Sequence, residues 1–165
     1  MKKTMLMLIV LVTVLVCGIW KITDYMEFKN DQDNLYNWVQ SFSSEDIEEV
    51  SATIFRENTA PKRYLFTADE TEELLNVLKV VPKEAFAQAE VKSLDGISVY
   101  ICRWKFDETA KSDLLLSYDN GITVLGFTSE MKDELLTAPE NENWAIKDEA
   151  LSAIMERYIA LIEEK

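Results

Sequence analysis

The sequence predicts an α+β fold, with an antiparallel sheet of about five to six strands packed by an N-terminal helix, a middle helix and a C-terminal amphipathic helix. Two Asx-Gly pairs, Asp95-Gly96 and Asn120-Gly121, lie between apolar, β-branched stretches and indicate two tight hairpins. Apolar residues at helical spacing indicate the helices. One membrane-spanning or leader helix precedes this fold, because residues 4–20 contain no charged side chain.

Composition divides the chain into a leader or anchor (residues 1–22), a juxtamembrane helical stalk (residues 23–43) and a single acidic α+β domain (residues 44–165). The last segment has the size of one ordinary domain. Cys102 is the only cysteine outside the leader, so no disulfide can form within the domain. We therefore expect one core that is held together by packing.

The apolar run would form a helix about 25 Å long, slightly shorter than a hydrocarbon core of about 30 Å. No Ala-x-Ala-like site follows it, which disfavours a plainly cleaved leader. The segment from Val14 to Cys17 resembles a bacterial lipobox, so Cys17 is a candidate for lipidation, although Val16 stands where that pattern has Gly, Ala or Ser. The alternative is a single-pass anchor extending to Ile22, in which Cys17 is one more apolar residue.

The charges around the apolar run predict its orientation. Lys2 and Lys3 precede it, whereas Asp24 and Glu27 follow it. By the positive-inside rule, the residues before the run stay in the cytoplasm and the body lies outside. Anchored or lipidated, the domain is predicted to be tethered to the outer face of a cell membrane.

Charge and composition exclude several classes of function. The chain has 17 basic and 30 acidic residues, and without Lys2, Lys3 and Lys21 the balance is −16. Such a charge repels phosphate backbones, so we expect no nucleic-acid partner. Histidine is absent, which removes histidine-based catalysis and the commonest transition-metal ligand. No glycine-rich phosphate loop is present, and we expect no cofactor.

In the first half of the body, residues 24–42 are predicted to be mostly helical with a break near Asn30. Residues 50–55 and 63–66 are predicted strands, joined by a turn at residues 57–61. Thr67 and Glu70 have the spacing of a capping box, and the helix they begin should end at Pro82. Its inward positions are predicted to be Leu74, Leu75, Val77 and Leu78.

In the second half, residues 87–94 and 97–106 are predicted to pair as the first hairpin, with 97–106 central in the sheet because both its faces are apolar. Residues 114–118 and 122–127 form the second hairpin. A short helix at residues 129–136 and a loop at 137–143 follow. The final amphipathic helix carries an apolar stripe formed by Ala150, Leu151, Ile154, Met155, Tyr158, Ile159 and Ile162.

The candidate sites are few. The acidic clusters at residues 45–49 and 69–73 are typical of solvated faces or helix N-termini, so no metal site is predicted. Cys102 has no base beside it in sequence and is interpreted as a core residue. Trp144 lies in a polar loop beside Asn141 and Asn143, and is the candidate for an exposed contact with a protein partner. No catalytic residue is predicted.

The order of features along the chain resembles that of small uncharacterised membrane-anchored or lipoprotein-like proteins of Gram-positive bacteria. These features are the basic leader, the apolar run near a cysteine, the tryptophan-bearing segment 35–42, and the helix that begins at Thr67 and precedes two hairpins. That resemblance implies location and no reaction. The leading hypothesis is a tethered, non-catalytic domain that binds a protein or peptide. The alternatives are an immunity-type or regulatory subunit of a membrane complex, and an extracytoplasmic hydrolase that uses two carboxylates.

Overall fold

The computed structural model describes residues 2–55, 60–89, 100–106, 113–119, 121–127, 136 and 144–164, and shows an α+β fold. The helices are α1 (Lys2–Ser41), α2 (Ala68–Val80) and α4 (Glu149–Glu164), with short 3-10 turns η1 (Ser44–Asp46) and η2 (Lys83–Ala85). The strands are β1 (Ile47–Ile54), β2 (Lys62–Leu65), β3 (Phe86–Gln88), β4 (Tyr100–Phe106), β5 (Asp113–Asp119), β6 (Ile122–Phe127) and β7 (Trp144–Ile146).

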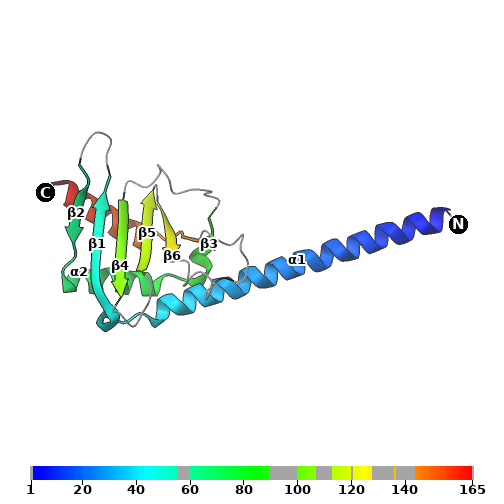
Figure 1. Cartoon of the computed structure of the whole chain (residues 1–165), viewed down its shortest axis with the longest axis horizontal. Helices are drawn as coiled ribbons and strands as arrows, with labels where there is room; N and C mark the ends of the chain where they lie inside the picture. The colour runs from blue at the N-terminus through cyan, green and yellow to red at the C-terminus, as the bar shows by residue number, and fades with distance from the viewer. Residues whose placement is uncertain are drawn as a thin grey trace.

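The described strands form one antiparallel sheet of seven strands in the order β2-β1-β4-β5-β6-β7-β3. The strand that the sequence does not predict is β7, which is only three residues long, and β3 is also shorter than predicted. Helices α2 and α4 lie behind the sheet in Figure 1, while α1 passes along its lower end and then projects far beyond it.

The second predicted hairpin is confirmed. Asp119 pairs with Ile122, so only Asn120 and Gly121 connect β5 to β6. Gly121 has a φ of 81°, in the left-handed region that a residue with a Cβ adopts only at a cost.

The first predicted hairpin is wrong in its pairing. β1 lies along one edge of β4 and β5 along the other, so the described residues of β4 have no edge free for Ala87 and Gln88. Phe86–Gln88 instead pairs with Trp144–Ile146 at the far side of the sheet. The prediction that β4 lies inside the sheet is confirmed. Asp95-Gly96 lies outside the described residues, as do the predicted helix and loop at 129–143 apart from Leu136.

Helix α1 runs without interruption through Asn30, so the predicted break is wrong. Asn and Asp favour helix ends in isolation, but here tertiary contacts hold the helix through this polar stretch. Beyond it, Leu35, Val39 and Phe42 are buried in the main core. The packed unit therefore begins inside the segment that the sequence suggested as a stalk.

Helices α2 and α4 form where they are predicted, although Ala150, predicted to belong to the apolar stripe of α4, is exposed. Thr67 accepts a hydrogen bond from the backbone of Glu70, and the Glu70 carboxylate accepts one from the backbone of Thr67, which completes the capping box. The core contains the inward residues of both helices and the strand residues that face them. Its buried helical members are Leu74, Leu75, Leu78, Leu151, Ile154, Met155, Tyr158 and Ile162.

Candidate functional site

The first half of α1 is an exposed apolar helix. Within Ile9–Ser41 an uninterrupted stretch reaches a mean hydropathy of 1.7, and none of that stretch is buried inside the protein. Helix α1 is long and apolar enough to cross a membrane. The exposed large apolar side chains of this half are Met5, Met7, Ile9, Val10, Leu11, Val12, Val14, Leu15, Val16, Ile19, Trp20, Ile22, Tyr25 and Met26.

Cys17 lies within this apolar half, with an exposed side chain and no disulfide. A Cβ added at the neighbouring Gly18 would meet nothing within 4 Å, so the surface of α1 is open here. The thiol is thus accessible for modification and equally suited to contact with lipid. For Cys102, the structure gives the backbone register: it pairs with Ala52 and Leu116, both of which are fully buried.

Trp144 is not an exposed contact, and that prediction is wrong. Its side chain is 0% exposed, because β7 places it in the core between strand β6 and helix α1. The indole stacks on the ring of Phe28, with centroids 5.4 Å apart and planes 13° apart. The polar residues that precede Trp144 misled the prediction, since they do not reveal the strand that begins at Trp144.

A set of polar contacts fixes α1 where it joins the body. The Gln32 side chain is 3% exposed and donates a 2.7 Å hydrogen bond to the carbonyl of Phe86. Its amide oxygen accepts a hydrogen bond from Lys29, and Asp33 pairs with Lys83 of η2. Two turns later, Gln40 donates to the carbonyl of Lys79 at the end of α2.

Sequence reasoning missed this junction, although a signal existed. Phe28, Gln32, Leu35, Val39 and Phe42 follow one another at alternating spacings of four and three, which place them on one face of a helix. A glutamine within an otherwise apolar face indicates a buried polar group that needs a partner. Its partner, a carbonyl 54 positions away, has no signature in the sequence.

The first of two carboxylate clusters joins α2 to α4. Glu73 accepts hydrogen bonds from Arg157 at 2.5 Å and from the Tyr158 hydroxyl at 3.0 Å. The hydrogen bond from Arg157 lowers the pKa of Glu73. Burial, reinforced by the bond to Glu73, raises the pKa of Tyr158 to about 12. Both groups therefore remain in their ordinary ionisation states at neutral pH, which suits a structural link.

Glu70 completes this first cluster. Beyond its capping-box bond it accepts a 2.7 Å hydrogen bond from the Tyr64 hydroxyl, and this bond raises the pKa of Tyr64. Glu70, Glu73, Arg157 and Tyr158 line a shallow open depression between α2 and α4. Each carboxylate is thus already engaged by protein donors.

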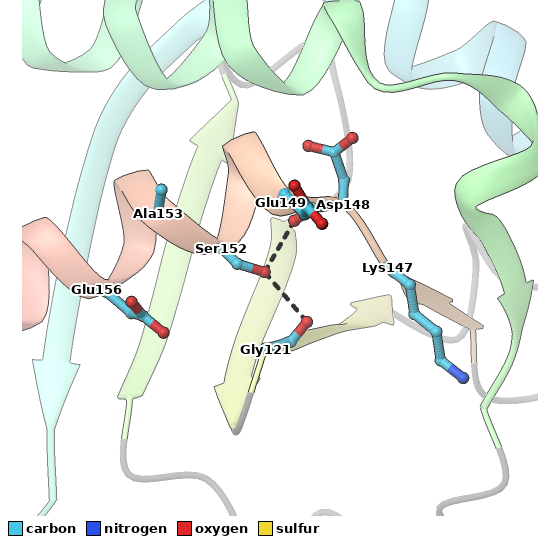
Figure 2. Close-up of a pocket in the computed structure, with 7 residues that line it drawn as sticks. All are labelled: Gly121, Lys147, Asp148, Glu149, Ser152, Ala153 and Glu156. Carbon is cyan, nitrogen blue, oxygen red and sulfur yellow. Dashed lines mark hydrogen bonds between the residues drawn. The ribbon is translucent and has the colours of Figure 1, made fainter.

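The second cluster lies where α4 begins (Figure 2). The Ser152 hydroxyl is within hydrogen-bonding distance of two carbonyl oxygens, of Gly121 at 3.1 Å and of Asp148 at 2.8 Å. Asp148 caps the helix by accepting from the backbone of Leu151. Glu156, one turn further along, accepts a 2.7 Å bond from the Tyr118 hydroxyl, and burial with this bond raises the pKa of Tyr118.

This second group also lines a shallow depression, from which the Lys147 side chain extends away in Figure 2. Its polar groups fasten α4 to the turn between β5 and β6. Of the acidic clusters noted in the sequence, Glu49 pairs with Arg63 across β1 and β2. Within the part of the chain that the structure describes, no group of three or more acidic or cysteine side chains is arranged to hold a metal ion.

A scan against protein-family models, a search of curated proteins and a search of solved structures each find no match for this chain. Helix α1 and the contacts of the body are therefore the features that bear on function.

Proposed function

We propose that this chain is a membrane-tethered domain that acts at the outer face of a membrane through contact with a protein or peptide. The observation that carries the proposal is the division of α1 into an exposed apolar half and a half built into the core. Exposed apolar side chains over several helical turns are unfavourable in water and favourable in a bilayer. One helix thus serves as both anchor and structural element.

The outward placement of the body is supported by charge. Lys2 and Lys3 lie before the apolar run, and the body beyond it is strongly acidic. The positive-inside rule favours an orientation in which the basic residues beside the apolar run stay in the cytoplasm and the part of the chain with few basic residues is moved outside. We propose that the leader is retained as a single-pass anchor, since Val16 is larger than the residue that lipoprotein processing favours before the cysteine.

The proposal includes that the domain is not catalytic. Glu70, Glu73 and Glu156 border the two depressions described above, and each accepts hydrogen bonds from side chains that hold helices in place. The role that these hydrogen bonds support for the three carboxylates is therefore structural. An acidic surface with such fixed side chains suits a partner with basic residues. A regulatory or immunity-type subunit of a membrane complex is the narrower form of the same proposal.

Mass spectrometry of the mature protein, taken from carbonate-washed native membranes, tests the anchor. We expect the unprocessed leader mass and full retention in the membrane pellet. A mature chain that begins at Cys17 with added acyl mass would replace the anchor by lipidation, and a Cys17→Ser variant would then lose the added mass. A soluble chain without residues 1–22 would contradict tethering altogether.

Photo-crosslinking in intact cells tests the protein contact. A crosslinker at surface positions of the body should give a discrete adduct with one membrane protein, and the same adduct should form when residues 2–22 are replaced by an unrelated spanning helix. Loss of the adduct in the replaced variant would assign the contact to the anchor itself. Absence of any discrete adduct from all faces of the body would contradict a binding function.

A further inference from the structure

Resting on the proposed membrane location, we infer that α1 holds the domain upright and directly above the lipid headgroups, with the β3–β7 edge of the sheet facing the bilayer and the β2 edge facing away. The domain then lies against the lipid headgroup layer. The headgroups contact the exposed segment of α1 from Trp20 to Met26.

Helix α1 contains no hinge between its two halves. After Gly18 the helix includes neither glycine nor proline, the usual causes of a kink. Its second half is held to the body by the Phe28–Trp144 stack and by hydrogen bonds from Gln32 and Gln40. The body must therefore follow the direction of the membrane-spanning half.

The apolar run is too short to tilt strongly. Residues 4–20 span about 25 Å as a helix, whereas the hydrocarbon layer is about 30 Å thick. Tilting shortens the projection of a helix on the membrane normal, so a run that is already short is best accommodated when it stands close to upright. Lys3 and Lys21 can extend their side chains towards the headgroups at the two ends.

The body begins immediately above the headgroups. Phe28, the first residue of α1 that stacks on the domain, lies about 12 Å of helix beyond Trp20, the last residue of the apolar run, and the headgroup layer on each side is about 5–8 Å thick. Between them, Tyr25 is 61% and Met26 is 65% exposed, and Trp20 is 74% exposed just below. Tryptophan and tyrosine are the side chains that favour this interface.

The direction of α1 relative to the sheet gives the orientation. In Figure 1 the strands lie across the line of α1, and α1 leaves the body on the side of β3. Passing up α1, Phe28 meets Trp144 of β7, Gln32 meets Phe86 of β3, and the chain reaches β1 only after the helix ends. The β3–β7 edge is therefore nearest the bilayer, and β2 is farthest from it.

Energy transfer to acceptor-labelled lipid headgroups tests this arrangement on the full-length chain in vesicles of phosphatidylcholine and phosphatidylglycerol. A genetically encoded fluorescent amino acid is placed at position 147 or at position 62, two exposed lysines that lie beside β7 and in β2. We expect transfer from position 147 to exceed that from position 62 about twofold or more, because strand spacings of about 4.8 Å accumulate between the two edges. Equal transfer from both positions would overturn the inference.

Two further variants make the outcome specific. A flexible Gly-Ser linker inserted after Met26 should remove the difference between the two positions, because the body could then tumble. A difference that persists with the linker would show that α1 does not set the orientation. The same fluorophore at position 15 should be quenched by brominated lipid tails. Absence of that quenching would contradict the membrane location itself and hence the proposed function, whereas quenching with equal edge transfer would contradict only the inference.

Discussion

The indole of Trp144 and the ring of Phe28 lie nearly parallel, with centroids 5.4 Å apart. This stack joins a helix that begins in an apolar, exposed run to a strand more than a hundred positions later in the chain. It lies at the level where α1 stops being exposed and starts to be part of the core, so it marks the lower boundary of the folded body.

Replacing Trp144 by alanine should lower the free energy of unfolding by about 3–5 kcal/mol, the usual cost of removing a buried aromatic side chain. Chemical denaturation of the full chain in detergent micelles, followed by circular dichroism, measures this change. Trp20→Ala is the matched control, because Trp20 is 74% exposed on α1 and should change the stability of the body by less than about 0.5 kcal/mol. Equal effects of the two substitutions would contradict the burial of Trp144.

Replacing Gln32 by alanine should destabilise the body by about 1–3 kcal/mol, since the carbonyl of Phe86 would lose its buried donor. Asn37→Ala on the same helix is the control, because Asn37 is exposed. The same denaturation measurement compares the two variants. A Gln32→Ala protein as stable as the control would show that the hydrogen bond to Phe86 does not hold α1 in place.

The raised pKa of Tyr158 predicts a loss of stability in alkali. Its folded value of about 12 exceeds the ordinary value of 10.0, so the folded state keeps a proton that the unfolded state releases. The stabilisation is complete below pH 10.0 and disappears as the pH rises through about 12. Urea midpoints measured across this range should fall for the native chain and fall less for Tyr158→Phe, and identical slopes would argue against the assignment.

The pair between Glu73 and Arg157 should contribute little, because both side chains are about half exposed. A double-mutant cycle with Glu73→Gln and Arg157→Met should give a coupling of about 1 kcal/mol or less at neutral pH. Arg157 lowers the pKa of Glu73 below its ordinary 4.5, so the coupling is present above that pH and is lost as the pH falls through the lowered value. A coupling free energy between Glu73 and Arg157 that increases as the pH falls would contradict the lowered pKa of Glu73.

Substituting Gly121 by alanine should cost about 1–2 kcal/mol, because its φ of 81° brings a Cβ close to the following carbonyl oxygen. Gly121→Asn is the matched variant, since asparagine tolerates the left-handed region better and should cost less. Thermal unfolding of the two variants gives the comparison. Equal destabilisation would indicate that the backbone angle at residue 121 is not what limits the hairpin.

The features that local chemistry determines could be predicted from the sequence. The turn at Asn120-Gly121 and the capping box of Thr67 and Glu70 depend on residues at most a few positions apart, and both are present. The pairing of β3 with β7 could not be predicted, because it joins two three-residue strands from distant parts of the chain. The burial of Trp144 could not be predicted either, because it depends on this same pairing of distant strands, and the polar residues before Trp144 suggest an exposed loop.

The two carboxylate clusters were also beyond sequence reasoning. Glu73 and Arg157 lie 84 positions apart, and Tyr118 and Glu156 lie 38 apart, so only packing of α4 on the sheet and on α2 brings them together. The apolar run of α1 could be predicted from the sequence, since a long uncharged apolar stretch indicates a membrane-spanning or leader helix. That α1 continues into the core could be read only from the structure.

Protease accessibility in spheroplasts of a bacterial host tests the central claim, an acidic domain tethered to the outer face of a membrane, most directly. With an epitope tag at the C-terminus, the account predicts that added protease removes the tag from intact spheroplasts, while a cytoplasmic marker protein in the same sample stays whole. Protection of the tag until the membrane is permeabilised would place the body on the cytoplasmic side and contradict the account.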